Sequence, residues 1–160
     1  MKIIKWIDIF YLTLLGITLG SVLSAGTITA PVIFNSQNYL HSQILSRYEE
    51  GLLMTAIFLK LNYLLIFTAI TVFLREGYDY KRFKRDKIIL ASSVIVLFGA
   101  FMFVFYYTPD IVAYQQAGEE MTKTEIFEKI HKGSEIDFKL LAAGLFSLLF
   151  RRLYLMIKSL

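Results

Sequence analysis

The stretch IILASSVIVLFGAFMFVFYY, residues 88–107, decides the fold of this chain because it contains no charged residue. An α-helix rises about 1.5 Å per residue, so about 20 apolar residues cross the roughly 30 Å of hydrocarbon in a bilayer. Backbone amides find no water there and must pair within a helix. The stretch therefore predicts a transmembrane helix.

Three further apolar segments lie along the chain, at residues 9–34, 52–74 and 136–157. The first continues well past the small residues at 24–26, so we expect an uncleaved helix rather than a signal peptide. The second is interrupted only by Lys60. Together with residues 88–107, these segments predict an all-α integral membrane bundle of four helices.

The fourth segment is the weakest, because charged residues lie near both of its ends: Asp137, Lys139, Arg151 and Arg152. Alone, it is also compatible with an interfacial helix. We favour a full span, since lysine and arginine side chains near a helix end can reach the headgroups.

The composition fits a single membrane domain over residues 1–160. Apolar residues make up 56% and charged residues 19% of the chain, against about 45–50% and 25% in soluble domains. The chain has no cysteine, which excludes disulfides, thiolate metal sites and cysteine nucleophiles. No phosphate loop, zincin motif, nucleophile elbow or pair of catalytic carboxylates is present. We expect no enzyme, no catalytic residue and no cofactor.

Lysine and arginine residues are concentrated on one side of the predicted bundle. They precede the first span, fill the connection at residues 75–87 and follow the apolar part of the fourth span. Because cytoplasmic segments carry this excess, we predict that both termini are cytoplasmic. The same rule accounts for the net charge of +4, so we expect lipid and no nucleic acid as a partner.

The connection between the third and fourth spans, residues 108–135, is too long for a tight turn. Pro109 suits the first turn of a helical continuation, where its missing N–H costs nothing. Thr122 and Glu125 have the spacing of a capping box and precede apolar residues at helical spacing. We predict a short amphipathic outer helix that lies on the surface or stacks directly on the fourth span, with a kink at Gly133.

Small residues recur every fourth position on the first span, at Gly16, Gly20 and Ser24. Such a ridge lets a second helix approach closely in lipid, where no hydrophobic force drives helices together. We predict that these three residues form a helix-packing surface. As partners of the bundle as a whole, a second copy of the chain and another membrane protein are both considered.

Four polar residues are candidates for a binding site in the outer half of the membrane. Lys60 lies near the middle of the second span, where a charge is costly unless it is paired or extends toward the headgroups. Its available partner is Asp137. His131, Ser134 and Asp137 follow at three-residue steps, which places them on one face of a helix. His131 and His41 are weak candidates for a metal site.

Three short motifs carry a resemblance. The first span contains Gly16, Gly20 and Gly26 and ends in Ala-Pro-Val-Ile-Phe at 30–34. The third leaves through Tyr-Thr-Pro-Asp-Ile at 107–111. The fourth is preceded by Phe-Glu-Lys-Ile-His-Lys-Gly-Ser at 127–134, with Gly144 farther along. Together they resemble the four-helix bacterial membrane family labelled domain of unknown function 4149, which is similar to eukaryotic transmembrane protein 205.

The resemblance implies four spans in a bacterial inner, or cytoplasmic, membrane. It also implies that Pro31 and Pro109 mark helix ends beside an outer polar site with His131 and Ser134. It implies no reaction.

The leading hypothesis is a non-enzymatic membrane bundle that binds or passes a small solute or ion through Lys60, His131, Ser134 and Asp137. One alternative is a metal- or haem-binding membrane protein that uses His131 and His41. Another is a scaffold subunit that serves a membrane partner without a ligand.

Overall fold

The computed structural model describes residues 2–40, 42, 44–82 and 86–158, and the described part contains helices and no strand. Four helical segments are long and apolar enough to cross a membrane: Trp6–Phe34, Arg47–Lys81, Lys87–Gln116 and Glu125–Lys158. The predicted four-helix membrane bundle is confirmed, including its fourth span.

Two spans are continuous α-helices, and two contain a π-helical turn. The continuous ones are α4 (Arg47–Lys81) and α7 (Glu125–Lys158). The first span comprises α1 (Lys2–Ser24), the π-turn η1 (Ala25–Thr29) and α2 (Ala30–Phe34). The third comprises α5 (Lys87–Met102), the π-turn η2 (Phe103–Tyr107) and α6 (Thr108–Gln116). Short helices α3 (Gln37–Leu40) and η3 (Glu119–Lys123, a 3-10 helix) belong to the connections.

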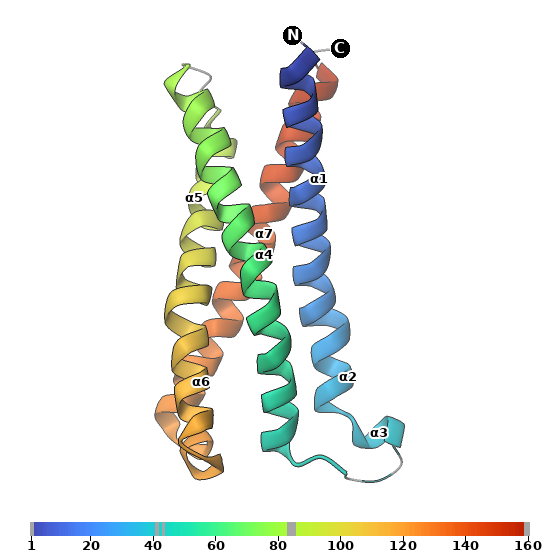
Figure 1. The fold of residues 1–160 in the computed structure, drawn as a ribbon, viewed down its shortest axis with the longest axis vertical. Helices are drawn as coiled ribbons and strands as arrows, with labels where there is room; N and C mark the ends of the chain where they lie inside the picture. Colours follow the sequence, from blue (N-terminus) through green and yellow to red (C-terminus); the bar gives the residue numbers. More distant parts are fainter. Residues whose placement is uncertain (1, 41, 43, 83–85, 159–160) are drawn as a thin grey trace.

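The four spans run antiparallel in sequence, so both ends of the chain lie at one end of the bundle (Figure 1). We call this the terminal end, and the opposite end, with α3 and η3, the distal end. Helices α1 and α5 each pack against both α4 and α7. At the distal end, α2 and α6 lie apart, on either side of α4 (Figure 1).

Each π-turn directly precedes a helix with proline in its first turn, Pro31 in α2 and Pro109 in α6. Proline lacks an N–H and its ring displaces the carbonyl four residues earlier, so the helix widens locally. The N–H of Ala30 accordingly donates to the carbonyl of Ala25, and that of Thr108 to Phe103. Pro31 lies close to the end of the first span, which finishes at Phe34. Pro109 does not mark a helix end, because the third span continues to Gln116.

The closest helix contact lies between α5 and α7, and two glycines make it possible. An added Cβ at Gly144 would lie 2.8 Å from Ile95 Cγ2, and one at Gly99 would lie 3.3 Å from Leu141 Cβ. Hydroxyl pairs reinforce the bundle: Thr18 with Thr68 at 2.7 Å, and Ser92 with Ser147 at 2.9 Å. Such pairs hold helices together in lipid.

The predicted ridge of Gly16, Gly20 and Ser24 does not pack within the chain. An added Cβ at either glycine would meet nothing within 4 Å, and Gly20 and Ser24 are exposed. The buried face of α1 is a different one, which includes Leu15 and Val22. The intramolecular packing prediction is wrong because the spacing of small residues does not say which face of a helix turns inward.

The outer segment takes the second of the two predicted arrangements, in which it stacks directly on the fourth span. Its residues from Glu125 onward form the first turns of α7, and Glu119–Lys123 form the short helix η3. The cap is Thr124, whose Oγ1 accepts from the N–H of Phe127 at 3.3 Å, and not Thr122. Gly133 makes no kink; an added Cβ there would lie 3.0 Å from the Tyr107 ring, so glycine admits this ring.

Candidate functional site

The divergence of α2 and α6 leaves a partly open cavity of about 880 Å³ in the distal half of the bundle. All four spans contribute to its wall. Its volume lies in the range of about 300–1,000 Å³ that is typical of small-molecule sites. The two π-turns face it through Gly26 and Phe103, so the proline-induced widening occurs at the level of the cavity.

The cavity is apolar inside and charged at its rim. The inner wall includes Val22, Met54, Phe58, Phe103 and Phe138. The rim carries exposed charged residues of both signs: Arg47, Glu119, Lys123, Glu128, Glu135 and Lys139. This gradient from an apolar interior to a charged rim suits a molecule with an apolar body and a polar head.

Three aromatic rings close the inner end of the cavity. Phe58 lies 5.3 Å from both Phe103 and Phe138 between ring centroids, and the latter two lie 5.0 Å apart. They come from α4, η2 and α7, so the cluster joins three spans. Gly26 faces it from the first span: an added Cβ would lie 3.5 Å from the Phe138 ring. A larger side chain at this position would therefore project into the cavity.

The structure places two of the four predicted site residues on the cavity wall, His131 and Ser134. His131 is half-exposed; its Nδ1 lies 3.5 Å from Glu135 Oε1, and its ring stacks on Phe127. Ser134 is buried and donates its hydroxyl proton to the carbonyl of His131 at 2.7 Å. Of the predicted stripe of His131, Ser134 and Asp137, two residues therefore face the cavity.

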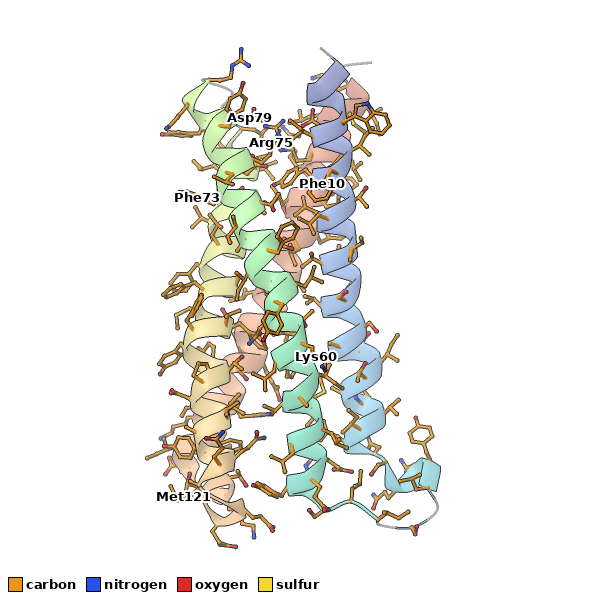
Figure 2. The ribbon with its side chains drawn as sticks, viewed as in Figure 1. Phe10, Lys60, Phe73, Arg75, Asp79 and Met121 are labelled. Carbon is orange, nitrogen blue, oxygen red and sulfur yellow. The ribbon has the colours of Figure 1, made fainter. Side chains whose placement is uncertain are left out.

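The other two predicted residues lie outside the cavity wall. Asp137 is buried and faces α5, where an added Cβ at Gly99 would lie 3.5 Å from its Oδ1. Lys60 is exposed, on α4 and well away from Arg75 and Asp79 at the terminal end (Figure 2). No ion pair joins Lys60 to Asp137 in the described part of the chain, so the suggested partnership is not observed.

Of the two metal candidates, the structure describes His131, whereas His41 lies outside the described residues. Among those the structure does describe, no group of three or more histidine, aspartate or glutamate side chains could hold a metal ion.

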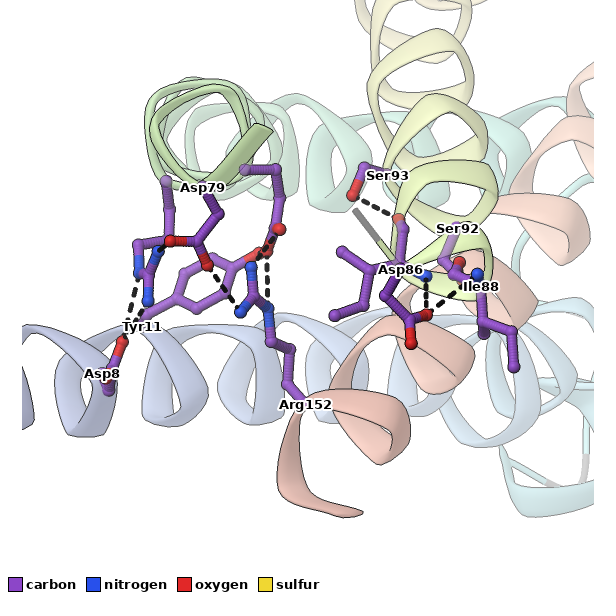
Figure 3. A network of polar contacts seen from close by, with 11 residues as sticks. Asp8, Tyr11, Asp79, Asp86, Ile88, Ser92, Ser93 and Arg152 are labelled. Atoms are coloured by element: carbon purple, nitrogen blue, oxygen red, sulfur yellow. Dashed lines mark hydrogen bonds and ion pairs between the residues drawn. The ribbon is translucent and has the colours of Figure 1, made fainter. Parts of the chain in front are cut away.

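A second polar feature, at the terminal end, is an ion-pair cluster that the sequence analysis missed. This terminal cluster consists of Asp8, Tyr11, Arg75, Glu76, Asp79 and Arg152 (Figure 3). Arg75 donates to Asp8 Oδ1 from Nη2 at 2.6 Å, and its Nη1 lies 2.7 Å from Asp79 Oδ1. The cluster therefore ties α1 to α4.

The same cluster also ties α7 to α4. Arg152 donates to Glu76 Oε1 from Nε at 3.0 Å and to Asp79 Oδ2 from Nη1 at 2.8 Å, and its Nη2 contacts Glu76 Oε2. The Tyr11 hydroxyl donates to Glu76 at 2.7 Å. The sequence analysis expected Arg152 to extend to the headgroups. In the structure it is bound inside the bundle instead. Five of these residues, all except Glu76, also line a smaller cavity of about 430 Å³.

Asp86 links the terminal ends of α5 and α7. Its Oδ1 accepts from the N–H groups of Ile88 and Ile89 at 3.0 and 3.1 Å, which caps α5. Its Oδ2 accepts from Arg151 Nη2 at 2.7 Å. The Arg151 hydrogen bonds, assisted by the two backbone N–H groups, hold the pKa of Asp86 below its ordinary value.

We expect Asp86→Ala to destabilise the bundle by about 0.5–2 kcal/mol, the usual cost of losing an N-cap. Because the folded pKa is lowered, the stabilisation is full above the unfolded value of about 3.9 and is lost as pH falls through the folded value. Thermal unfolding in detergent across this range measures it. Asp86→Asn keeps a capping oxygen and should lose less; a pH-independent difference from wild type would contradict the assignment.

Comparison of this chain with known proteins gives one match, to a protein family. No curated protein matches the chain, and no solved structure does. A family described as Domain of unknown function (DUF4149) matches residues 13–120, more than half of the chain. The match covers the distal π-turns and both prolines but ends before α7, so it does not include His131. The four-span membrane architecture and this match agree, and the chain belongs to the DUF4149 family.

Proposed function

We propose that this protein binds an amphiphilic small molecule in its distal cavity. The observation that carries the proposal is the gradient of the cavity wall, from the rings of Phe58, Phe103 and Phe138 to a charged rim. The apolar chain of such a ligand would pack against these rings, away from water and lipid. Its polar head would stay among the charged residues of the rim. His131 and Ser134 supply polar contacts on the α7 side.

The proposal narrows the earlier hypothesis of a solute- or ion-binding site. A bare ion gains little from an aromatic interior, because removing it from water costs several kcal/mol without compensating ligands. The rim charges are of both signs, and Lys123 is bound by Glu119 and Glu120 at 3.1 and 2.8 Å. Such a rim favours a polar or zwitterionic head over a strongly charged one.

We expect Gly26→Trp to abolish binding of a fluorescent lysophosphatidylcholine analogue to the purified protein. The indole would project toward Phe138 and occupy the cavity. Fluorescence titration in a detergent of low background measures the dissociation constant. The matched control is Gly20→Trp on the same helix, where an added Cβ meets nothing within 4 Å.

The control variant should bind the probe as the wild type does. Equal binding by wild type and Gly26→Trp would reject the cavity as the site, as would equal loss in both variants. An anionic fatty-acid analogue and a cationic alkylamine, tested in the same way, define the preferred head group.

We further propose that the terminal end faces the cytoplasm of a bacterium and that the distal cavity opens on the opposite face. The described basic residues Lys81, Arg82, Lys87 and Lys158 at the terminal end support this orientation, because cytoplasmic segments carry an excess of lysine and arginine. The test is a fusion, after Lys158, of a reporter enzyme that is active only outside the cytoplasm. Activity of this fusion would reverse the proposed orientation. The similarity to eukaryotic transmembrane protein 205 stays a prediction.

A further inference from the structure

Asp137 is a buried carboxyl group in the distal half of α7, and one of its oxygens has no partner among the described residues. The residue is 7% exposed, and Oδ2 makes no hydrogen bond to any described residue. An ionised carboxylate in such surroundings costs several kcal/mol unless a cation or several donors compensate it. The group therefore needs a compensating ligand that the described side chains do not provide.

The neighbouring elements supply no positive charge. On the α5 side, Asp137 faces the backbone of Gly99, which has no side chain. An added Cβ at Gly99 would lie 3.5 Å from Asp137 Oδ1. From η2, Tyr107 is the titratable group that interacts electrostatically with Asp137. On α7 itself, His131 and Lys139 each pair with Glu135, at 3.5 and 3.8 Å.

The side facing α4 is also neutral. Phe58 contacts Phe138, the residue after Asp137, at 5.3 Å between ring centroids. One helical turn further along α4 is Asn62, which is 7% exposed and whose Oδ1 also lacks a partner. Lys60 on this helix is exposed and forms no ion pair with a described residue. Asn62 Oδ1 and Asp137 Oδ2 thus lie on adjacent spans, and neither accepts a hydrogen bond from a described residue.

We propose that Asp137 is a proton-binding site that holds a proton at neutral pH and exchanges it with the distal cavity. Protonation forms an O–H bond on the carboxyl group and removes the buried charge, and the proton comes from and returns to cavity water. The route is short, because Ser134 and Phe138, on either side of Asp137 in α7, both line the cavity. This site is independent of any amphiphile.

The proposed proton site would couple the charge of one residue to the packing of two helices. Asp137 lies against Gly99, in the α5–α7 contact where Gly99 also meets Leu141 at 3.3 Å from its would-be Cβ. Loss of the proton would put a negative charge into this contact. Since α7 carries part of the cavity wall, ionisation would change the cavity as well.

Infrared difference spectroscopy of the purified protein in nanodiscs tests the proposal. At neutral pH we expect a carbonyl stretching band of a protonated carboxyl group that disappears only on alkaline titration. Asp137→Asn should lose the band. Asp110→Asn, which removes a half-buried aspartate of the distal end, should keep it. A wild type without the band at neutral pH, or an Asp137→Asn variant that retains it, would overturn the assignment.

Isotope labelling keeps the test decisive if Asp137→Asn does not fold. In wild-type protein, ¹³C-aspartate should shift the band and ¹³C-glutamate should not; the reverse result overturns the proposal. Transfer into D₂O should shift the band by exchanging its proton. A band that never shifts would overturn exchange with the cavity.

Discussion

Replacing Gly144 by leucine is expected to destabilise the folded bundle by about 3 kcal/mol or more, the upper range for overpacked cores. Even a methyl group at this position would lie 2.8 Å from Ile95 Cγ2 and 3.2 Å from Val96 Cγ2. Both neighbours are β-branched and cannot swing away, so α5 and α7 must separate. Separation would also strain the Ser92–Ser147 hydrogen bond. Thermal unfolding in detergent measures the loss.

The matched control for Gly144→Leu is Gly20→Leu. Both glycines lie inside spans, but Gly20 faces outward and has nothing within 4 Å of its would-be Cβ. We expect the monomer to keep its unfolding temperature. Equal destabilisation by both variants would show that the loss of glycine itself, and not the α5–α7 contact, is responsible.

Arg152→Met is expected to cost about 3–5 kcal/mol, because removing one partner leaves buried charge uncompensated. Among the described residues, Glu76 would keep only the hydroxyl of Tyr11, whereas Asp79 would keep Arg75. The side chain of Arg152 is 16% exposed and that of Glu76 only 10%, so water screens little. Thermal unfolding in detergent measures the loss.

Two further variants separate charge from side-chain size. Arg151→Met removes an arginine that is more exposed and pairs with one described carboxylate, Asp86, rather than with two, and should cost less. Adding Glu76→Gln to Arg152→Met removes the uncompensated charge and should restore part of the stability. A double variant no more stable than Arg152→Met would argue that Arg152 acts through packing.

The four spans could be predicted from the sequence because hydrocarbon imposes a one-dimensional constraint. A stretch such as residues 88–107 leaves its backbone no alternative to a helix. That His131 and Ser134 share one face of α7 could be predicted, since helical periodicity fixes which residues share a face. The suggested pairing of Lys60 with Asp137 could not, because position along a span does not say toward which neighbour a side chain turns.

Which face turns inward was not predictable, because lipid and protein interior are about equally apolar. The regular ridge of Gly16 and Gly20 faces outward, whereas Gly99 and Gly144, which have no regular spacing, form the close contact. The terminal cluster had one signal in the sequence. Arg75 and Arg152 lie at the same depth as acidic residues on neighbouring spans, so pairing was an alternative to extension toward the headgroups.

The terminal cluster has a consequence for biogenesis. Arg152 meets Glu76 and Asp79 from 76 and 73 positions away in the chain, so its pairing must wait until the last helix has entered the bilayer. Until then, Glu76 lacks its cation in an intermediate of three helices. A chain interrupted before α7 would leave that acid without its arginine inside the membrane, so we expect such a chain to be less stable than the complete bundle.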